Sequence, residues 1–289
     1  TFGAVGVMNA FVEMMGEGDK ICHDMPPRFA DNARWKLQYE FAPQMKGLLQ
    51  FEDGNDVLIE NVLQVKPDVC VTMTKSTAEF LAEHGLAAVY FEWKGIEDIP
   101  VAVTLMGEVL NKPDVAADYI QYFDEKVAYA NSLTADLADE DRQKVVYGSV
   151  IELSQPHIIA EWWITEAGAI SVTNDGREEE SLTYSIEDLL KWNPDVILMS
   201  SNQRDDIKAE KRYANIPAVK NDRMYAMPTV AHVWGNRSVE QILTIFYAMN
   251  KIYPDLMPDE KLAEEIGYFY SHFFKYDLSD DQLAEIINN

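Results

Sequence analysis

A segment that occurs twice in the chain is the strongest constraint on its fold. IENVLQVKPDV spans Ile59–Val69 and IEDLLKWNPDV spans Ile186–Val196, and the two share Ile, Glu, Leu, Pro, Asp and Val at the same places. In each copy, apolar residues recur at helical spacing until a proline, which lacks an amide hydrogen and ends the helix. An apolar, β-branched run follows each proline and is typical of a buried parallel strand. Each copy therefore predicts a helix that leads into a strand.

The sequence around each copy repeats as well. A helix and a strand are predicted before the first copy, in residues 7–24, and before the second, in residues 159–175. Alternating helices and strands with short connections favour parallel sheets, and the duplication predicts two of them. We therefore expect an α/β fold of two similar lobes, with an N-terminal lobe at 1–111 and a C-terminal lobe with terminal helices at 139–289.

The segment between the lobes, residues 112–138, predicts a long connecting helix. Pro113 suits a first helical turn, and an apolar stripe follows it with no Gly or Pro in the next 20 residues. Because a packed helix is stiffer than a Gly/Ser linker, we expect a rigid connection.

Composition excludes several classes of function. The chain carries 49 acidic and 24 basic residues, a net charge of -25, and such a surface repels nucleic acid. The sequence holds no uninterrupted apolar stretch of about 18 residues, the length expected of a membrane span. It begins without Met and without a leader, which suggests a processed or trimmed chain and leaves export open. Cys22 and Cys70 lie in strand-like runs and are expected to be buried free thiols. The sequence contains neither a CxxC nor an HExxH motif, so we do not expect a zinc site.

A set of segments, taken in order, resembles a known family: the substrate-binding proteins of ATP-driven (ABC) uptake transporters. The resemblance is to the helix-backboned class, which carries iron-siderophores, haem, cobalamin and, in some members, molybdate or tungstate. It implies a ligand cleft between the lobes, no enzymatic activity, and a periplasmic or cell-surface location, with a lipid anchor as one option. In this family a strand normally precedes a loop such as TFGAVG, and here little precedes it. The segments that carry the resemblance are GEGDKIC, IENVLQVKPDVCV, the helix after Pro113, SIEDLLKWNPDVILMS, AVKNDRMYAMP and VWGNRSVEQILTIFYAMNKIYP.

The resemblance also implies a role for the glutamate of the repeat. In well-studied members, one Glu of this helix in each lobe forms a salt bridge with arginines of the membrane permease, and the matching residues are Glu60 and Glu187. The alternative is that both are first-turn acids, which the helix dipole favours by a few tenths of a kcal/mol.

Ligands of open α/β sheets bind beyond the carboxyl ends of the strands, so the loops there hold the candidate ligand residues. The densest group is AHVWGNRS, which offers an aromatic ring, an imidazole and a guanidinium for a planar chelate or an anion. His157 and His232 are also candidates to complete the coordination of a metal that the ligand carries; no intrinsic cofactor is expected. The predicted ligand-binding residues are Phe2, Arg28, Trp35, Lys75, Gln155, His157, His232, Trp234, Asn236 and Arg237.

Three functions follow from these features. The leading one is a monomeric receptor that binds a metal chelate, above all an iron complex, and delivers it to an ABC permease. The second is a receptor of the same class for molybdate or tungstate, or for cobalamin or haem. The third is an enzyme of related two-lobed topology, with His157 and Glu161 as acid and base; we do not favour it, because the sequence has no nucleophile elbow, phosphate loop or dinucleotide fingerprint.

Overall fold

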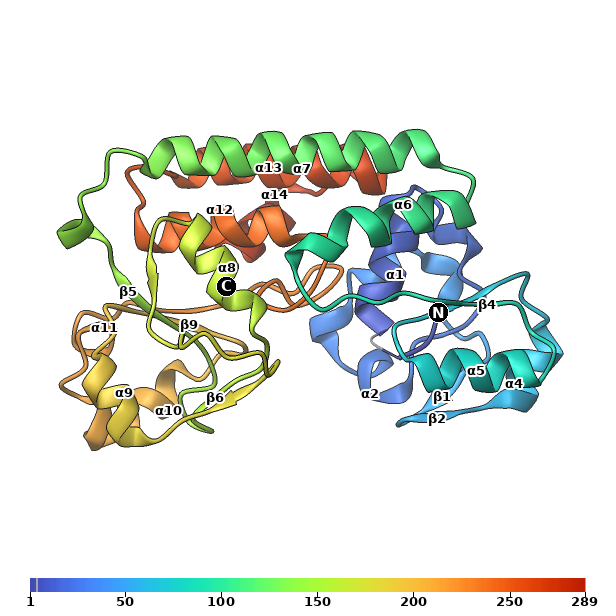
Figure 1. Ribbon diagram of the computed structural model, residues 1–289, viewed down its shortest axis with the longest axis horizontal. Helices are drawn as coiled ribbons and strands as arrows, with labels where there is room; N and C mark the ends of the chain where they lie inside the picture. The colour runs from blue at the N-terminus through green and yellow to red at the C-terminus, as the bar shows by residue number, and fades with distance from the viewer. Residues whose placement is uncertain (4, 289) are drawn as a thin grey trace. The chain divides into compact units, whose positions relative to one another are not determined.

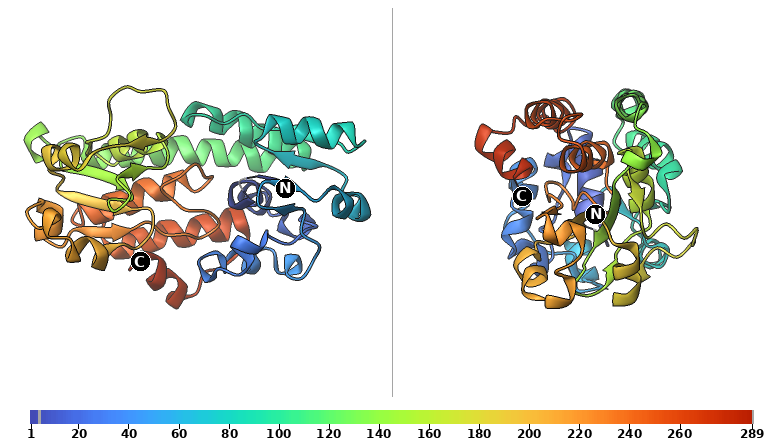
Figure 2. Two further views of the ribbon diagram at one scale, coloured as in Figure 1. Left: turned by 90° about the horizontal axis from the view of Figure 1, so that it is seen from below. Right: turned by 90° about the vertical axis from the view of Figure 1, so that its left-hand side faces the viewer.

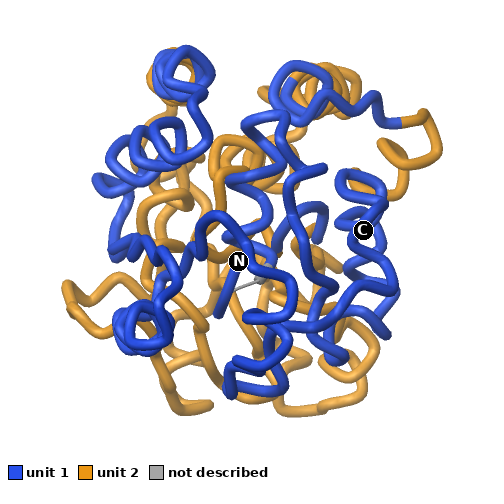
Figure 3. Tube along the Cα trace, turned by 90° about the vertical axis from the view of Figure 1, so that its right-hand side faces the viewer, with its two compact units in different colours: residues 1–121, 229–232, 269–278 blue, residues 122–228, 233–268, 279–289 orange. Residues whose placement is uncertain are grey.

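The computed structural model describes residues 1–3 and 5–288, which divide into two compact units. Unit 1 comprises Thr1–Gln121, Thr229–His232 and Phe269–Leu278; unit 2 comprises Tyr122–Pro228, Val233–Tyr268 and Ser279–Asn289 (Figure 3). Two short segments of the predicted C-terminal lobe, 229–232 and 269–278, thus belong to unit 1.

Unit 1 is built from short strands and helices. Strands β3 and β4 pair in parallel, and β1 and β2 form an antiparallel hairpin. The strands are β1 (Glu52–Asp53), β2 (Asp56–Val57), β3 (Cys70–Thr72) and β4 (Ala88–Tyr90). The helices are α1 (Val5–Met14), α2 (Pro27–Ala30), α3 (Gln38–Phe41), α4 (Ile59–Val65), α5 (Lys75–Glu83) and α6 (Ile99–Val109). Unit 1 also has the 3-10 helices η1 (Gly18–Lys20), η2 (Ala33–Trp35), η3 (Pro43–Met45) and η4 (Ile96–Asp98) and the π-helix η7 (Tyr270–Phe274).

Unit 2 contains a parallel sheet in the order β10-β9-β5-β7 and a small antiparallel pair, β6 with β8. The strands are β5 (Lys144–Gly148), β6 (Ser154–Gln155), β7 (Ile170–Ser171), β8 (Leu182–Thr183), β9 (Val196–Met199) and β10 (Met224–Ala226). The helices are α8 (Ile159–Glu166), α9 (Ile186–Trp192), α10 (Arg204–Ala209), α11 (Pro217–Lys220), α12 (Gln241–Ile252), α13 (Asp259–Phe269) and α14 (Asp280–Ile287), with 3-10 turns η5 (Asp139–Asp141) and η6 (Lys211–Tyr213).

Helices cover both faces of the sheet in unit 2 (Figure 1). On β5, Val146 packs into a core with residues of α9, α10 and α11, while its neighbour Tyr147 meets Trp163 of α8 with ring centroids 5.2 Å apart. Successive side chains of a strand point to opposite faces, so a strand covered on both sides must be apolar throughout. Strand β9, VILM, is buried at every position. This confirms the predicted α/β fold with parallel strands.

The repeated segment has the same conformation in both units. Helices α4 and α9 each run for seven residues, and each ends at a residue in the left-handed conformation, Lys66 (φ 56°) or Asn193 (φ 49°), directly before the proline. A proline disfavours the right-handed helical conformation in the residue before it, which explains the common stop. Val62 and Leu189, at equivalent positions, are both fully buried. The predicted helix, proline and strand are confirmed in both copies.

The strand predicted before the first copy is absent from the described residues. Instead of a strand in KICHD, the chain makes the turn η1, and Ile21 donates its N–H back to Gly18 rather than to a neighbouring strand. Isolated bridges join Asp24 to Gln50 and Phe2 to Thr72. Cys22 is therefore in irregular, partly exposed backbone, Cys70 is buried in β3, and both are free thiols. Burial raises the pKa of the Cys70 thiol.

The long helix is confirmed as α7 (Pro113–Thr134), which is unbroken over 22 residues (Figures 1 and 2). Its N-terminal part belongs to unit 1, where Tyr119 packs edge-on against Phe273; its C-terminal part belongs to unit 2, where Phe123 stacks on Trp162. Among the described residues, no helix has the length and apolar character needed to cross a membrane.

Candidate functional site

In unit 1, Trp35 and His232 lie together. Trp35 at the end of η2 is 7% exposed, its ring meets that of Phe29 edge-on at 5.0 Å, and its centroid lies 5.5 Å from that of the His232 imidazole. The sequence predicts both residues for the site but assigns them to different lobes. The return of residues 229–232 to unit 1 is what brings them into contact.

Polar side chains of unit 1 hold this returning segment. Arg34 Nε donates to Thr229 Oγ1 at 2.6 Å, and the amide of the fully buried Gln38 donates to the Ala231 carbonyl at 2.7 Å. Gly6 on α1 lies directly beneath the pair, since a Cβ there would stand 2.6 Å from both His232 Nδ1 and the Trp35 ring. Glycine at this position therefore allows the two rings to approach α1.

In unit 2, a second group joins His157, Glu180 and Arg237. Glu180 Oε1 lies 3.2 Å from Arg237 Nη1 and 4.0 Å from His157 Nε2. The side chains of His157 and Arg237 are 7% and 22% exposed, while that of Glu180 is 54% exposed. A solvent-facing carboxylate is thus placed against a guanidinium and an imidazole that lie deeper in the protein.

The hydrogen bond at Nδ1 fixes the tautomer of His157. Nδ1 accepts the backbone N–H of Ile159 at 3.0 Å, so in the neutral imidazole the proton is on Nε2. Nε2 is buried and has no hydrogen-bond partner among the described residues. Burial, with a smaller effect of the nearby Arg237 charge, lowers the pKa of His157 to about 4. Above that pH, His157 offers one neutral N–H donor beside Glu180.

A buried polar network holds the loop that carries Glu180. Glu161 Oε1 on α8 accepts from Gln155 Nε2 at 2.9 Å, from Thr173 Oγ1 at 2.9 Å and from Arg177 Nη2 at 3.0 Å. Gln155 is fully buried, and the side chains of Arg177 and Glu161 are 7% and 11% exposed. Gln155, predicted to bind ligand, here positions the loop around His157. The sequence pairs Glu161 with His157 only in the enzyme alternative, and it does not indicate Arg177 or Glu180, because each is typical of an ordinary surface charge.

The motif AHVWGNR, predicted to act together, is divided between the two units. His232 is in unit 1, whereas Trp234 is fully buried in unit 2, where its indole N–H donates to Glu240 at 2.9 Å. Asn236 accepts the Tyr147 hydroxyl at 2.9 Å, and Arg237 joins the His157 group. Trp234 and Asn236 thus make packing and hydrogen-bonding contacts within unit 2.

The remaining predicted residues lie apart from these groups. Phe2 is fully buried and stacks on Phe51 at 5.7 Å, so its side chain contributes to the core of unit 1. Arg28 is exposed, with its guanidinium 4.7 Å from the centre of the Phe29 ring, next to Trp35. Lys75 is exposed at the first residue of α5.

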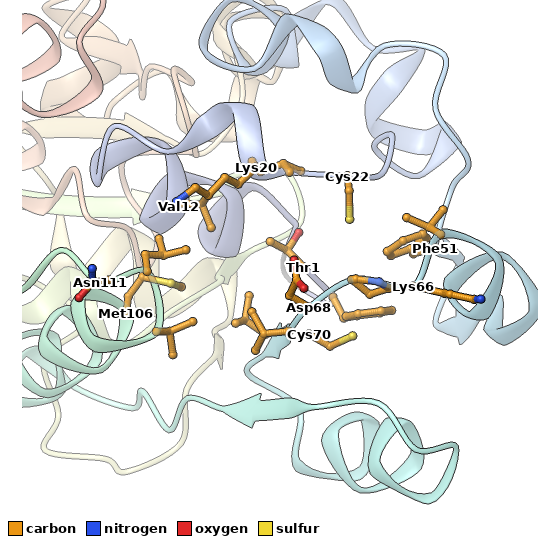
Figure 4. Close-up of a pocket in the computed structure, with 18 residues that line it drawn as sticks. Thr1, Val12, Lys20, Cys22, Phe51, Lys66, Asp68, Cys70, Met106 and Asn111 are labelled. Carbon is orange, nitrogen blue, oxygen red and sulfur yellow. The ribbon is translucent and has the colours of Figure 1, made fainter.

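Unit 1 also contains a cavity of about 610 Å³, around which Cys22, Phe51, Cys70 and Met106 lie (Figure 4). Residues 65–71 line it, so it lies at the amino end of β3. Ligands of α/β sheets bind at the opposite, carboxyl end. Of the predicted ligand-binding residues, Phe2 alone lines this cavity. We therefore do not propose the cavity as the ligand-binding site.

No set of three or more His, Cys, Asp or Glu side chains in residues 1–3 and 5–288 is arranged to hold a metal ion. His157 and His232, the imidazoles predicted to complete the coordination of a ligand-borne metal, belong to different units. Glu60 and Glu187 are exposed, and each is the second residue of its helix, α4 or α9.

Comparisons with known proteins agree with this architecture. The sequence matches the family described as periplasmic binding protein over residues 30–231. The molybdate-binding protein MolA of Haemophilus influenzae is 26% identical, covering 87% of this chain and 81% of its own length.

Solved structures extend the match to almost the whole chain. A periplasmic solute-binding protein of Veillonella parvula superposes with a TM-score of 0.80 and 27% identity, covering 96% of this chain and 88% of that one. MolA of Haemophilus influenzae bound to molybdate superposes with a TM-score of 0.76 and 18% identity, covering 94% and 92%. These relatives are binding proteins of transport systems and not enzymes, which confirms the prediction, made from the sequence, that the chain is a binding protein without enzymatic activity. The chain belongs to the periplasmic binding protein family, as an ABC-transporter substrate-binding protein of the helical-backbone type.

Proposed function

We propose that this protein is an extracytoplasmic receptor that captures an anionic solute and delivers it to an ABC permease. The observation that carries the proposal is the group in unit 2, where the His157 N–H and the Arg237 guanidinium both face the carboxylate of Glu180. A site that accommodates a carboxylate of its own chain has the donors that an external anion needs. Charge-assisted bonds from arginine are also the stronger class of hydrogen bond.

The first candidate solute is a tetrahedral oxyanion of the molybdate or tungstate type. Such an anion needs N–H donors rather than metal ligands, and the His157 group supplies donors. The similarity to MolA, a molybdate-binding protein, supports this choice both in sequence and in fold. This ranking of the candidate ligands is the reverse of the one based on the sequence alone, in which an iron complex comes first.

The second candidate is an anionic metal chelate, above all an iron complex. The observation that favours it is the Trp35–His232 pair in unit 1, where an indole and an imidazole lie within 5.5 Å and offer an aromatic surface with a nitrogen ligand. Cobalamin and haem would use the same surface. In this alternative, His232 and His157 are the residues that would complete the metal's coordination, and the metal arrives with the ligand.

Calorimetric titration with molybdate, tungstate, sulfate and ferric citrate separates the candidates. We expect molybdate or tungstate to bind, sulfate to bind more weakly, and His157→Ala and Arg237→Ala each to lower the affinity at least tenfold. Binding of ferric citrate alone would support the chelate. An unchanged affinity in both variants would refute the assignment of the His157 group to the ligand.

We further propose that Glu60 and Glu187 dock the receptor on the permease and that the protein works as a monomer in the periplasm or at the cell surface. Replacing both by Ala should abolish stimulation of the permease ATPase while leaving ligand affinity unchanged. Full stimulation by the double variant would rule out this docking role.

A further inference from the structure

Two leucines of the repeated segment are exposed at the same place in the two units. Leu63 on α4 and Leu190 on α9 occupy equivalent positions, and their exposed fractions are 41% and 44%. The residue just before each of them, Val62 or Leu189, is fully buried. The helices therefore have a defined core-facing side, and both leucines lie away from it.

Each exposed leucine shares a helix face with the acid of the repeat. Glu60 precedes Leu63 by three residues, and Glu187 precedes Leu190 by three, a spacing at which helical side chains are neighbours. All four side chains are exposed. A single exposed leucine is ordinary on a protein surface. The same leucine beside the same acid, once in each unit, is a repeated surface feature and needs a repeated cause.

We infer that each unit carries a docking patch made of one acid and one leucine, Glu60 with Leu63 and Glu187 with Leu190, and that each patch binds one membrane subunit of the permease. The inference rests on the proposed function and goes beyond the acids alone. The occupant that fits two equal patches is a partner that presents two equal surfaces, each with a basic group for the carboxylate and an apolar depression for the leucine. A partner that binds the same patch on each unit accounts for the repetition.

The two parts of a patch contribute differently. An ion pair at the rim of an interface contributes little and is screened by salt, whereas burying a leucine is insensitive to moderate salt. A leucine covered by a partner should change the dissociation constant by about 10-fold or more when it is removed. The leucines should therefore contribute most of the affinity for the permease that remains at high ionic strength.

The test measures binding of the ligand-free protein to its purified permease in nanodiscs, at 50 and 500 mM NaCl. The variants are Leu63→Ser, Leu190→Ser and the double variant. Leu48→Ser is the matched control, because Leu48 is also 41% exposed and lies outside both patches. Because the replaced side chains are exposed, the melting temperatures of all variants should match that of the wild type.

We expect about a 10-fold higher dissociation constant for each single variant, a larger loss for the double variant at both salt concentrations, and no change for Leu48→Ser. Wild-type binding by the double leucine variant, together with weakened binding by Glu60→Ala/Glu187→Ala, would overturn this inference and leave the proposed docking role intact. Wild-type binding by both double variants would refute the docking role as well.

Discussion

At the scale of single residues, the proposed function implies that an anionic solute competes with the Glu180 carboxylate for Arg237 and His157. This carboxylate faces Arg237 Nη1 at 3.2 Å and the His157 imidazole at 4.0 Å, yet the Glu180 side chain is half exposed and free to leave. Half-exposed ion pairs contribute at most about 1 kcal/mol, so a doubly charged anion can displace this carboxylate.

Replacing Glu180 by Gln should therefore raise the affinity for the anion that binds best in calorimetry, by about 10-fold, since a negative charge that repels the ligand is removed. Glu179→Gln is the matched control, because Glu179 is exposed on the same loop. A lower affinity in Glu180→Gln would instead make Glu180 a ligand-binding residue.

His157 predicts a pH dependence of stability. Its pKa is lowered from 6.5 to about 4 in the folded protein, so between these values the unfolded chain takes up a proton that the folded protein does not. The free energy of unfolding should fall as the pH drops through this window, by up to roughly 3 kcal/mol from this group. In His157→Asn, the side-chain oxygen can still accept the hydrogen bond from the Ile159 N–H, but the side chain at this position no longer titrates.

Urea unfolding at pH 7, 6, 5 and 4.5 checks this prediction. The wild type should lose more stability on acidification than His157→Asn, and His23, whose buried imidazole also has a lowered pKa, affects both proteins equally. Parallel pH curves for the two proteins would contradict the prediction.

The sequence predicts some of these site residues and misses others. His157 and Arg237 are predictable as site candidates because they follow strands, where α/β proteins bind their ligands. Glu180 is not predictable, since it stands in a run of three glutamates that reads as a solvated surface. Its position depends on the buried bond between Arg177 and Glu161, which joins residues of different elements.

At the scale of elements, helices α4 and α9 were predictable because their signals are local: a helical apolar spacing and a proline stop. The strand expected in KICHD was not formed, since a strand exists only where a neighbour pairs with it, and here Asp24 makes one isolated bridge with Gln50. Apolar composition alone does not provide that neighbour.

The two helix ends predict a difference between otherwise equivalent positions. Lys66 and Asn193 both adopt positive φ, but the left-handed conformation costs lysine more than it costs asparagine. Lys66→Gly should stabilise the protein by about 0.5 kcal/mol, whereas Asn193→Gly should change stability by only about 0.2 kcal/mol. Chemical denaturation measures both; equal effects would show that the residue type at these ends does not matter.

At the scale of the whole molecule, the course of the chain between the units is the feature that the sequence least reveals. Thr229 contacts Arg34 across 195 positions of sequence, and this contact belongs to a segment of only four residues, 229–232, that returns to unit 1. No local pattern specifies a contact of that range. The predicted motif AHVWGNR consequently contributes to both units rather than to one cluster.

The net charge of the molecule gives a last prediction, on the rate of ligand capture. A protein with a charge of -25 repels an anion at long range, although at the proposed site the Arg237 guanidinium would attract it at short range and the neutral His157 N–H would donate to it. Salt screens the long-range repulsion, because the Debye length falls from about 30 Å at 10 mM to about 8 Å at 150 mM. Short contacts in a partly buried site are screened much less.

The association rate constant for an anionic solute should therefore rise a few-fold between 10 and 150 mM NaCl, whereas electrostatic attraction would make it fall. Stopped-flow measurement of tryptophan fluorescence with molybdate or tungstate follows this rate, and the dissociation rate constant should change less. A steady decrease of the association rate with salt would show that local positive charge, such as that of Arg237, outweighs the net charge even at long range. In that case, the acidic residues would have to lie far from the path by which the anion enters.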